Sequence, residues 1–276
     1  MRPLVETDWL LKNLDKVKIF DSSLHLPNAN RNAEKEFNEK HIPGSIFFDI
    51  DRYSDKNNPL PHMMTKIDEW NNIMSDFGIT KKDHIVIYDN SELYSSCRLW
   101  FSFLYFGHDP DLVSVLNGGL KKWVNEGKVT TSQTKLIEKS IYQAREIKEL
   151  ILSRKEIDKN IIEKKFDLID ARNKDRFDGN VKEPRKGLRS GSIPNSKNLY
   201  FKDCLNDDNT FKKTSELRKL FQNLDISKNM AFTCGSGVTA CVLGLANSLI
   251  NDKTPVIYDE SWSGYGMIKN ENGKKI

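Results

Sequence analysis

The chain has 276 residues, of which 38% are hydrophobic and 30% are charged, a composition that suits one large or two compact folded domains and excludes a disordered tail. The net charge is only +4 and no long basic cluster occurs, so nothing favours a nucleic-acid partner. The N-terminus lacks the apolar core of a signal peptide, and no apolar run approaches the roughly 20 residues of a membrane helix. Four cysteines in a chain of this size are too few for a disulfide scaffold, so we expect a cytoplasmic protein with no membrane partner.

Short runs rich in β-branched and aromatic residues alternate with longer amphipathic runs along the chain. Strands that alternate with helices predict an α/β fold, with mostly parallel sheets and helices on both faces of each sheet. In chain order, the pattern predicts strands at 17–20, 85–88, 113–116, 166–169, 231–233 and 256–258, and helices at 67–77, 97–106, 216–221 and 238–250.

The second half of the chain repeats motifs of the first half in the same order. The offset between matched residues drifts only from 149 (Asp21 to Asp170) to 142 (Asn117 to Asp259), which indicates a duplicated domain with small loop differences. We therefore predict two tandem α/β domains, at 1–130 and 146–276. The polar stretch at 131–145 is the predicted linker between them.

Cys234 follows a predicted strand and precedes Gly235, Gly237 and the start of a predicted helix. Glycines allow successive backbone N–H groups to form an anion-binding nest, and the helix dipole adds positive potential. Both effects favour a thiolate, so Cys234 is the predicted nucleophile. The loop residues expected to bind the reacting group are Gly235, Ser236, Gly237, Val238 and Thr239.

The other three cysteines, Cys97, Cys204 and Cys241, lack such a context and are expected to be small buried hydrophobic residues. Whether any of them has a redox role is left open by the sequence.

Two other motifs overlap the same loop. A cysteine phosphatase requires arginine after five intervening residues, but Ala240 stands there, which excludes that class. The run from Gly235 to Ala240 also fits the dinucleotide-binding pattern G-x-G-x-x-A, with Asp259 lying 19 residues beyond Ala240. Only 17 residues follow Asp259, however, which leaves no room for the remaining strands of a nucleotide-binding domain.

The loop Cys234-Gly-Ser-Gly-Val-Thr-Ala resembles the active-site loop of the 3-mercaptopyruvate sulfurtransferases of the rhodanese superfamily. The resemblance covers nearly the whole chain and implies two tandem rhodanese-like domains, of which only the second keeps the cysteine, because Asp89 stands at its place in the first. The motifs that carry it are His41-Ile-Pro-Gly, Phe47-Phe-Asp-Ile-Asp51, Asn117-Gly-Gly-Leu, Glu183-Pro-Arg185, Ile193-Pro and Tyr258-Asp-Glu-Ser-Trp262.

The activity implied by this resemblance is sulfur transfer from 3-mercaptopyruvate through a persulfide on Cys234, with release of pyruvate. The implied acceptor is a thiol such as that of thioredoxin, or cyanide in the test tube. No metal or organic cofactor is implied, and no His/Cys spacing suggests a zinc site.

The same resemblance assigns the remaining site residues. Arg176 and Arg185 are expected to bind the donor carboxylate, a role that suits the planar fork of a guanidinium group. Asp51 and His62, together with Ser236 of the catalytic loop, match a proposed Asp–His–Ser relay for proton transfer.

Two rival functions stay open on the same fold. The loop interior carries no charge, which favours mercaptopyruvate over the thiosulfate dianion as donor without excluding a thiosulfate sulfurtransferase. The second rival is a non-catalytic rhodanese-like module that binds a partner or senses oxidants through Cys234.

Overall fold

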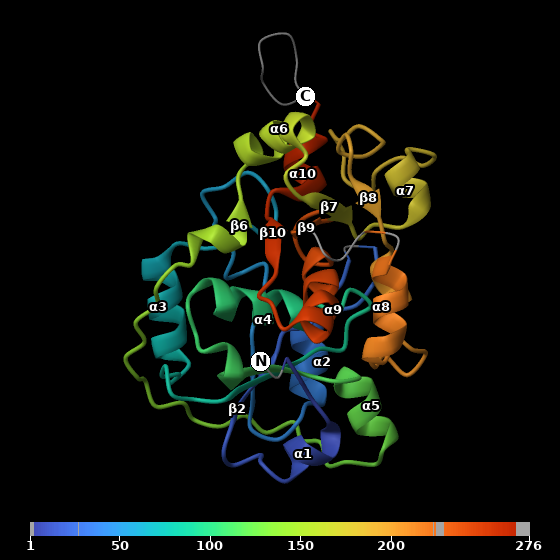
Figure 1. Cartoon of the computed structure of the whole chain (residues 1–276). Helices are drawn as coiled ribbons and strands as arrows, with labels where there is room; N and C mark the ends of the chain where they lie inside the picture. The colour runs from blue at the N-terminus through green and yellow to red at the C-terminus, as the bar shows by residue number, and fades with distance from the viewer. Residues whose placement is uncertain (1–2, 27, 223, 225–228, 269–276) are drawn as a thin grey trace. The chain divides into compact units, whose positions relative to one another are not determined.

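The structure is a computed structural model that describes residues 3–26, 28–222, 224 and 229–268 (Figure 1). By their internal contacts, the described residues divide into two compact units. The first unit lies within 1–56, 64–148 and 205–211, and the second within 57–63, 149–204 and 212–276. The predicted domain limits did not separate two short segments, 57–63, which is grouped with the second unit, and 205–211, which is grouped with the first. The limits themselves stay a prediction.

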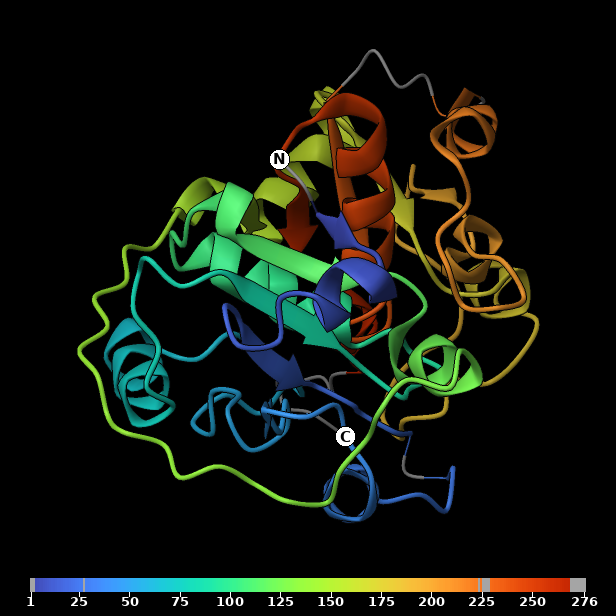
Figure 2. The ribbon, with the colours of Figure 1, turned by 90° about the horizontal axis from the view of Figure 1, so that it is seen from below.

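The first unit contains a parallel sheet with the strand order β1-β5-β4-β2-β3. Figure 2 shows the blue β1 beside the green β5, followed by the teal β4 and the blue β2. The central strands are fully buried, as expected for a parallel sheet covered on both faces. The strands are β1 (Leu4–Val5), β2 (Lys18–Asp21), β3 (Ser45–Phe47), β4 (Ile85–Tyr88) and β5 (Val113–Leu116).

Helices cover both faces of this first sheet. Val86 and Tyr88 point to one face, where they pack in a core cluster with Leu10 of α1 (Thr7–Leu11) and Trp123 of α5 (Gly119–Asn125). Phe20 points to the other face, where its ring contacts aromatic side chains of the α3–α4 layer. The remaining helices of the unit are α2 (Ala33–Glu39), α3 (Ile67–Asp76) and α4 (Ser96–Tyr105), with short 3-10 turns η1 (Pro110–Leu112) and η2 (Lys148–Leu150).

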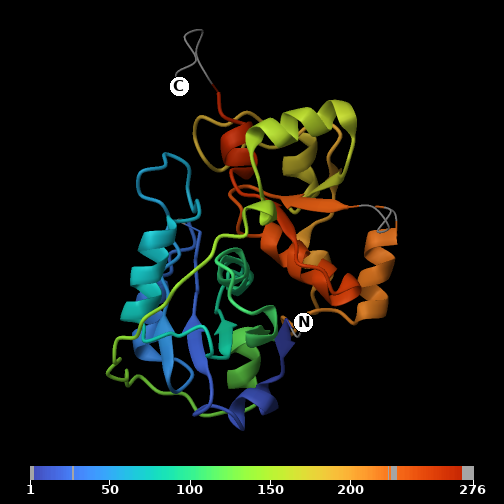
Figure 3. The same ribbon diagram turned by 60° about the vertical axis from the view of Figure 1, so that its left-hand side comes forward.

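The second unit repeats this architecture with the strand order β6-β10-β9-β7-β8, again parallel. Ile157 of α6 and Trp262 of α10 pack on one face of the sheet, and α8 and α9 cover the other, as Figure 3 shows. The strands are β6 (Ile151–Leu152), β7 (Asp167–Asp170), β8 (Lys197–Asn198), β9 (Met230–Thr233) and β10 (Val256–Tyr258). The helices are α6 (Arg154–Glu163), α7 (Lys174–Asp178), η3 (Phe201–Cys204), α8 (Thr214–Gln222), α9 (Ala240–Asn251) and α10 (Ser261–Tyr265).

The predicted duplication and fold class are confirmed. The two sheets have the same strand order when each strand of the first half is matched to its repeat in the second. Local contacts repeat as well, since the Ser45 hydroxyl donates to the Ile42 carbonyl and the Ser196 hydroxyl to the Ile193 carbonyl, both over 2.6 Å. Each unit is an α/β domain with a parallel sheet between two helical layers.

Each predicted element is observed within two residues of its expected limits, with one informative difference. Six further helices among the described residues were not predicted, namely α1, α2, α5, α6, α7 and α10. The last long helix was expected from residue 238, but α9 begins at Ala240. The residues between β9 and Ala240 form a loop instead, in which Gly237 has a positive φ of 77° that favours glycine. The short strands β1, β3, β6 and β8 were not predicted, because runs of two or three residues carry no periodic signal.

The polar segment at 131–145 contains neither helix nor strand, yet it is held against the first unit. Tyr142 is buried, and its hydroxyl lies 3.0 Å from Nδ1 of His108. The backbone N–H of Ser140 donates to the carbonyl of Ser75 (2.9 Å), and that of Ala144 donates to the Asn71 side chain (2.7 Å). The contacts of this segment therefore fix its course without regular structure.

Candidate active site

Cys234 directly follows β9, the central strand of the second sheet. The carboxyl ends of parallel strands meet at one edge of a sheet, which places Cys234 where loops from neighbouring strands converge. Its carbonyl accepts a hydrogen bond from the N–H of Trp262 (2.9 Å), and the Gly235 carbonyl accepts one from the N–H of Ser263 (2.8 Å). The loop after β9 is thus tied to the start of α10.

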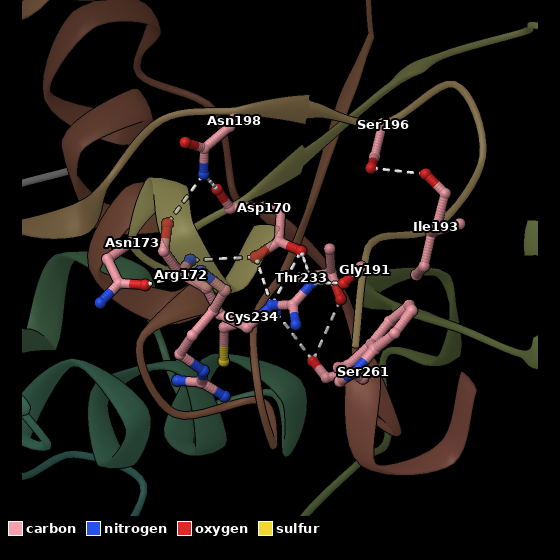
Figure 4. Close-up of polar contacts among 12 residues, drawn as sticks. Asp170, Arg172, Asn173, Gly191, Ile193, Ser196, Asn198, Thr233, Cys234 and Ser261 are labelled. Atoms are coloured by element: carbon pink, nitrogen blue, oxygen red, sulfur yellow. Dashed lines mark hydrogen bonds and ion pairs between the residues drawn. The ribbon is translucent and has the colours of Figure 1, made fainter. Parts of the chain in front are cut away.

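The hydroxyl of Ser261 makes the central contact of this loop. It accepts the N–H groups of Cys234 and Gly237, both over 3.1 Å, and donates to the carbonyl of Tyr258 over 2.9 Å. Ser261 is completely buried and has a positive φ of 49°, which is uncommon outside glycine. One oxygen therefore fixes both ends of the segment that carries the thiol. Figure 4 shows Ser261 beside Cys234, the first of these ends.

The sequence predicted that the N–H groups of the whole loop would form an anion-binding nest. Those of Cys234 and Gly237 are instead taken by Ser261. Within the described part of the chain, no acceptor is found for the N–H groups of four other loop residues, so these donors are available to an anionic sulfur. They belong to Gly235, Ser236, Val238 and Thr239.

Both predicted donor-binding arginines lie beside the loop. A side-chain carbon built at Gly235 would stand 3.1 Å from Nη2 of Arg176 and 3.8 Å from Nη1 of Arg185. Arg176 belongs to α7, whose first turn is capped by the side chain of Asn173, which accepts the N–H of Arg176 over 3.1 Å. Glycine at 235 thus leaves room for the close approach of a guanidinium group, and Gly235 is not among the glycines with a positive φ.

A buried ion-pair network supports Arg176 (Figure 4 shows its Asp170–Arg172 part). Arg172 binds Asp170 through Nε and Nη2, the latter over 2.7 Å, and binds Glu183 through Nη1 over 2.9 Å. Glu183 in turn accepts from Nε and Nη2 of Arg176 over 3.2 and 2.6 Å. Burial lowers the pKa of the Arg172 guanidinium, but the bonds to Asp170 and Glu183 outweigh it and the pKa is raised overall.

His62 and Ser236, two members of the predicted relay, are in contact. Nδ1 of His62 lies 2.9 Å from the Ser236 hydroxyl, and both side chains are buried. His62 has a positive φ of 60° and belongs to the segment 57–63 of the second unit. Asp51, the third predicted member, belongs to the first unit and is exposed, so its part in the relay stays a prediction.

All four cysteines are free and buried, so burial does not distinguish Cys234 from the others. Their surroundings differ. Burial, with a further contribution from Asp203, raises the pKa of Cys204 to about 12, which keeps that thiol protonated at neutral pH. Cys241 donates its S–H to the Gly237 carbonyl over 3.2 Å. Only Cys234 precedes the loop residue that the two arginines approach.

The sequence analysis missed two groups that hold the site. Ser261 was part of a recognised motif, but its hydroxyl gave no sign of its role, because the two N–H groups it binds lie 24 and 27 positions away. The pairing of Arg172 with Asp170 could have been predicted from the sequence. An aspartate at a strand end, followed two residues later by an arginine, is a spacing that permits a local ion pair.

The described residues hold no group of three or more His, Cys, Asp or Glu side chains that could bind a metal ion. Among the helices in the described part of the chain, none is both long and apolar enough to cross a membrane.

Replacing Ser261 with alanine is expected to reduce both stability and the reactivity of the Cys234 thiol. The change leaves two buried N–H groups without an acceptor, at a cost of about 1–3 kcal/mol for each. Thermal unfolding and the rate of iodoacetamide labelling measure the two effects. Ser263→Ala is the matched control, because the loop keeps its backbone hydrogen bond to residue 263 in that variant. If Ser261→Ala had the same thermal stability and labelling rate as this control, the role given to Ser261 would be contradicted.

The rhodanese-like domain family matches residues 6–126 and 153–267. The chain is 36% identical to the 3-mercaptopyruvate sulfurtransferase of Mus musculus, over 96% of this chain and 92% of that protein. It is 35% identical to the thiosulfate sulfurtransferase of Rattus norvegicus, over 95% and 91%. The crystal structure of the 3-mercaptopyruvate sulfurtransferase SseA of Escherichia coli superposes with a TM-score of 0.85 at 30% identity, covering 95% of this chain and 99% of that one. The chain therefore belongs to the rhodanese family of sulfurtransferases, in its tandem two-domain form.

Proposed function

We propose that the protein transfers sulfur from 3-mercaptopyruvate to a thiol acceptor through a persulfide on Cys234. The observation that carries the proposal is the position of Arg176 and Arg185 beside Gly235, next to the nucleophile. The loop itself, from Gly235 to Thr239, contains no charged side chain. This arrangement offers one cationic region at the side of the thiol rather than a charge within the loop.

The two arginines suit a donor that carries a carboxylate next to its reacting carbon. A guanidinium group donates two parallel charge-assisted hydrogen bonds to a carboxylate. We infer that Arg185 and the open edge of Arg176 hold the carboxylate of mercaptopyruvate, which directs its thiol sulfur toward Cys234.

In the first half-reaction, the Cys234 thiolate attacks the thiol sulfur of the donor. An S–S bond forms, the C–S bond of the donor breaks, and its electron pair moves onto carbon to give the enolate of pyruvate. The enolate must then take up a proton, which the donor thiol has to lose. The outer sulfur remains on Cys234 as an anion, for which the unpaired N–H groups of the loop are suitable donors.

The pair His62–Ser236 is our proposed path for this proton. The 2.9 Å contact between Nδ1 and the hydroxyl links an imidazole, a side chain that can take up and release a proton, to the catalytic loop. In this proposal Asp51 orients the imidazole, the part that an acid plays in a catalytic triad.

In the second half-reaction, an acceptor thiol attacks the outer sulfur, takes it as a persulfide and restores the Cys234 thiolate. Thioredoxin is the acceptor we propose, and cyanide serves the same purpose in the test tube by forming thiocyanate. A reducing compartment supplies such thiols, and the cytoplasm is our proposed location.

A thiosulfate sulfurtransferase is the second candidate. Relatives with that name match the chain about as well as the mercaptopyruvate enzymes do, with 35% and 36% identity to the examples above. The absence of charge from the loop between Gly235 and Thr239 favours the mercaptopyruvate assignment, because a dianion gains more than a monoanion from a cation placed inside the loop.

Transfer to cyanide with 3-mercaptopyruvate and thiosulfate compared side by side tests the proposal. We expect kcat/KM to be at least about tenfold higher for mercaptopyruvate, which corresponds to about 1.4 kcal/mol. Cys234→Ser is expected to abolish turnover with both donors, and to abolish the mass increase of one sulfur atom that the donor gives to the protein. Cys241→Ser, a change at another buried thiol, is expected to keep the turnover and the mass increase. Turnover by C234S would refute the mechanism, and a preference for thiosulfate would assign the second function.

Arg185→Ala is expected to raise KM for mercaptopyruvate by about tenfold or more, since a charge-assisted hydrogen bond contributes about 1.5–3 kcal/mol. Arg185→Lys keeps the charge but loses the planar fork, so an intermediate value is expected. Lys186→Ala removes the neighbouring exposed charge and controls for general electrostatics. Equal losses with thiosulfate and with mercaptopyruvate would rule out carboxylate recognition by Arg185.

His62→Gln separates the relay from simple positioning of the loop. Only mercaptopyruvate requires a proton on carbon, because thiosulfate leaves as sulfite without one. We therefore expect kcat to fall by about 100-fold with mercaptopyruvate and by less than about threefold with thiosulfate. Asp51→Asn is expected to show the same selectivity with a smaller loss. A uniform loss with both donors would show that His62 has only a structural part.

A further inference from the structure

Glu183 is a buried carboxylate shared by two arginines. Its side chain is 1% exposed, as is that of Arg172, whereas Arg176 is 24% exposed. Glu183 takes Nη1 of Arg172 over 2.9 Å and two nitrogens of Arg176 over 2.6 and 3.2 Å. A carboxylate without such partners would be costly to bury, so the burial of Glu183 depends on both guanidinium groups.

This sharing limits what Arg176 can offer to a ligand. Its Nε and one edge of Nη2 are used by Glu183, which leaves Nη1 and the second N–H of Nη2 on the side that approaches Gly235. Arg172 offers nothing to a ligand, since its nitrogens bind Asp170, Glu183 and the carbonyl of Gly191. Glu183 therefore decides how many donors the cationic region presents.

Glu183 also decides the charge of this region. Its carboxylate is one of two, with that of Asp170, that are buried against the guanidinium groups of Arg172 and Arg176. Removing the charge of Glu183 would add one positive charge to this region, in surroundings where charges are weakly screened.

We propose that Glu183 determines donor specificity by lowering the positive charge of the site, which favours a singly charged anion, a 2-oxo carboxylate that carries a thiol, over dianions such as thiosulfate. The proposal rests on the function proposed above, because it explains the choice between the two donors. It makes Glu183 a specificity-determining residue that acts through Arg176 without touching the donor.

The test compares donors in Glu183→Gln, which keeps the size of the side chain and removes its charge. The ratio of kcat/KM for thiosulfate to that for mercaptopyruvate is expected to rise at least tenfold, at constant ionic strength. Asp178→Asn is the matched control, because it removes an exposed carboxylate of α7, the helix that carries Arg176, and this carboxylate pairs with Lys174, outside the network. Its ratio is expected to stay within twofold of that of the wild type.

Glu183→Asp keeps the charge and shortens the reach to Arg176. Its rates are expected to fall with both donors while their ratio stays near that of the wild type. A ratio that is unchanged in Glu183→Gln, or that rises as much in Glu183→Asp, would overturn the proposal and leave Glu183 as a purely structural residue.

A binding assay distinguishes a failure of this inference from a failure of the proposed function. Protection of Cys234 from the neutral reagent iodoacetamide is measured with pyruvate as the monoanion and sulfate as the dianion. In the wild type, pyruvate is expected to protect at concentrations at least tenfold lower than sulfate, and Glu183→Gln is expected to narrow or reverse this difference. The wild-type comparison also applies if Glu183→Gln does not fold, and equal or better protection by sulfate would then overturn the proposal, whatever donor the enzyme uses.

Discussion

The hydroxyl of Ser261 is the contact on which the geometry of the site depends. It binds the N–H groups at both ends of the segment from Cys234 to Gly237 and is itself anchored to the carbonyl of Tyr258. A nucleophilic sulfur needs a loop that is ordered before the donor arrives, because ordering it during the reaction would add to the barrier. A single buried oxygen provides this order and leaves the neighbouring N–H groups for the anion that forms on sulfur. The positive φ of Ser261 is the local strain that accompanies this placement.

The arginines around this loop differ in how deeply they are buried and in how many of their donors are already paired. Arg172 is buried and fully paired, Arg176 is half-paired and partly exposed, and Arg185 stands beside the loop with Arg176. This order positions the guanidinium group of Arg176 through that of Arg172, because Glu183 fixes the plane of Arg176 while Arg172 fixes Glu183. Glu183 thus affects both the orientation of Arg176 and the charge of the cationic region.

Much of this could be predicted from the sequence, and the reasons for the exceptions are physical. Local sequence patterns predict the buried strands, which are β-branched runs, and the reactive Cys234, which has glycines beside it. Arg176 and Arg185 were identified by resemblance, since their pattern alone is that of exposed loop residues. Ser261 was missed because its partners are distant in sequence. The late start of α9 was missed because helical periodicity continues into the loop, where only the backbone of Gly237 shows that the helix has not begun.

In the first unit, the loop that corresponds to the Cys234 loop carries a carboxylate of its own, that of Asp89. Asp89 occupies the place of Cys234, and its carbonyl accepts the N–H of Leu120 (3.0 Å) as that of Cys234 accepts the N–H of Trp262 (2.9 Å). The Asp89 carboxylate takes the N–H groups of Ser91 and Ser96 in its own loop, over 2.9 and 2.8 Å, and burial raises its pKa. Ser91 stands at the place of Ser236, so one donor that the second unit leaves for an external sulfur is satisfied internally in the first. Both units keep the backbone contact that follows the central strand, and the residue at this position supplies a carboxylate to its own loop in the first unit and a thiol in the second.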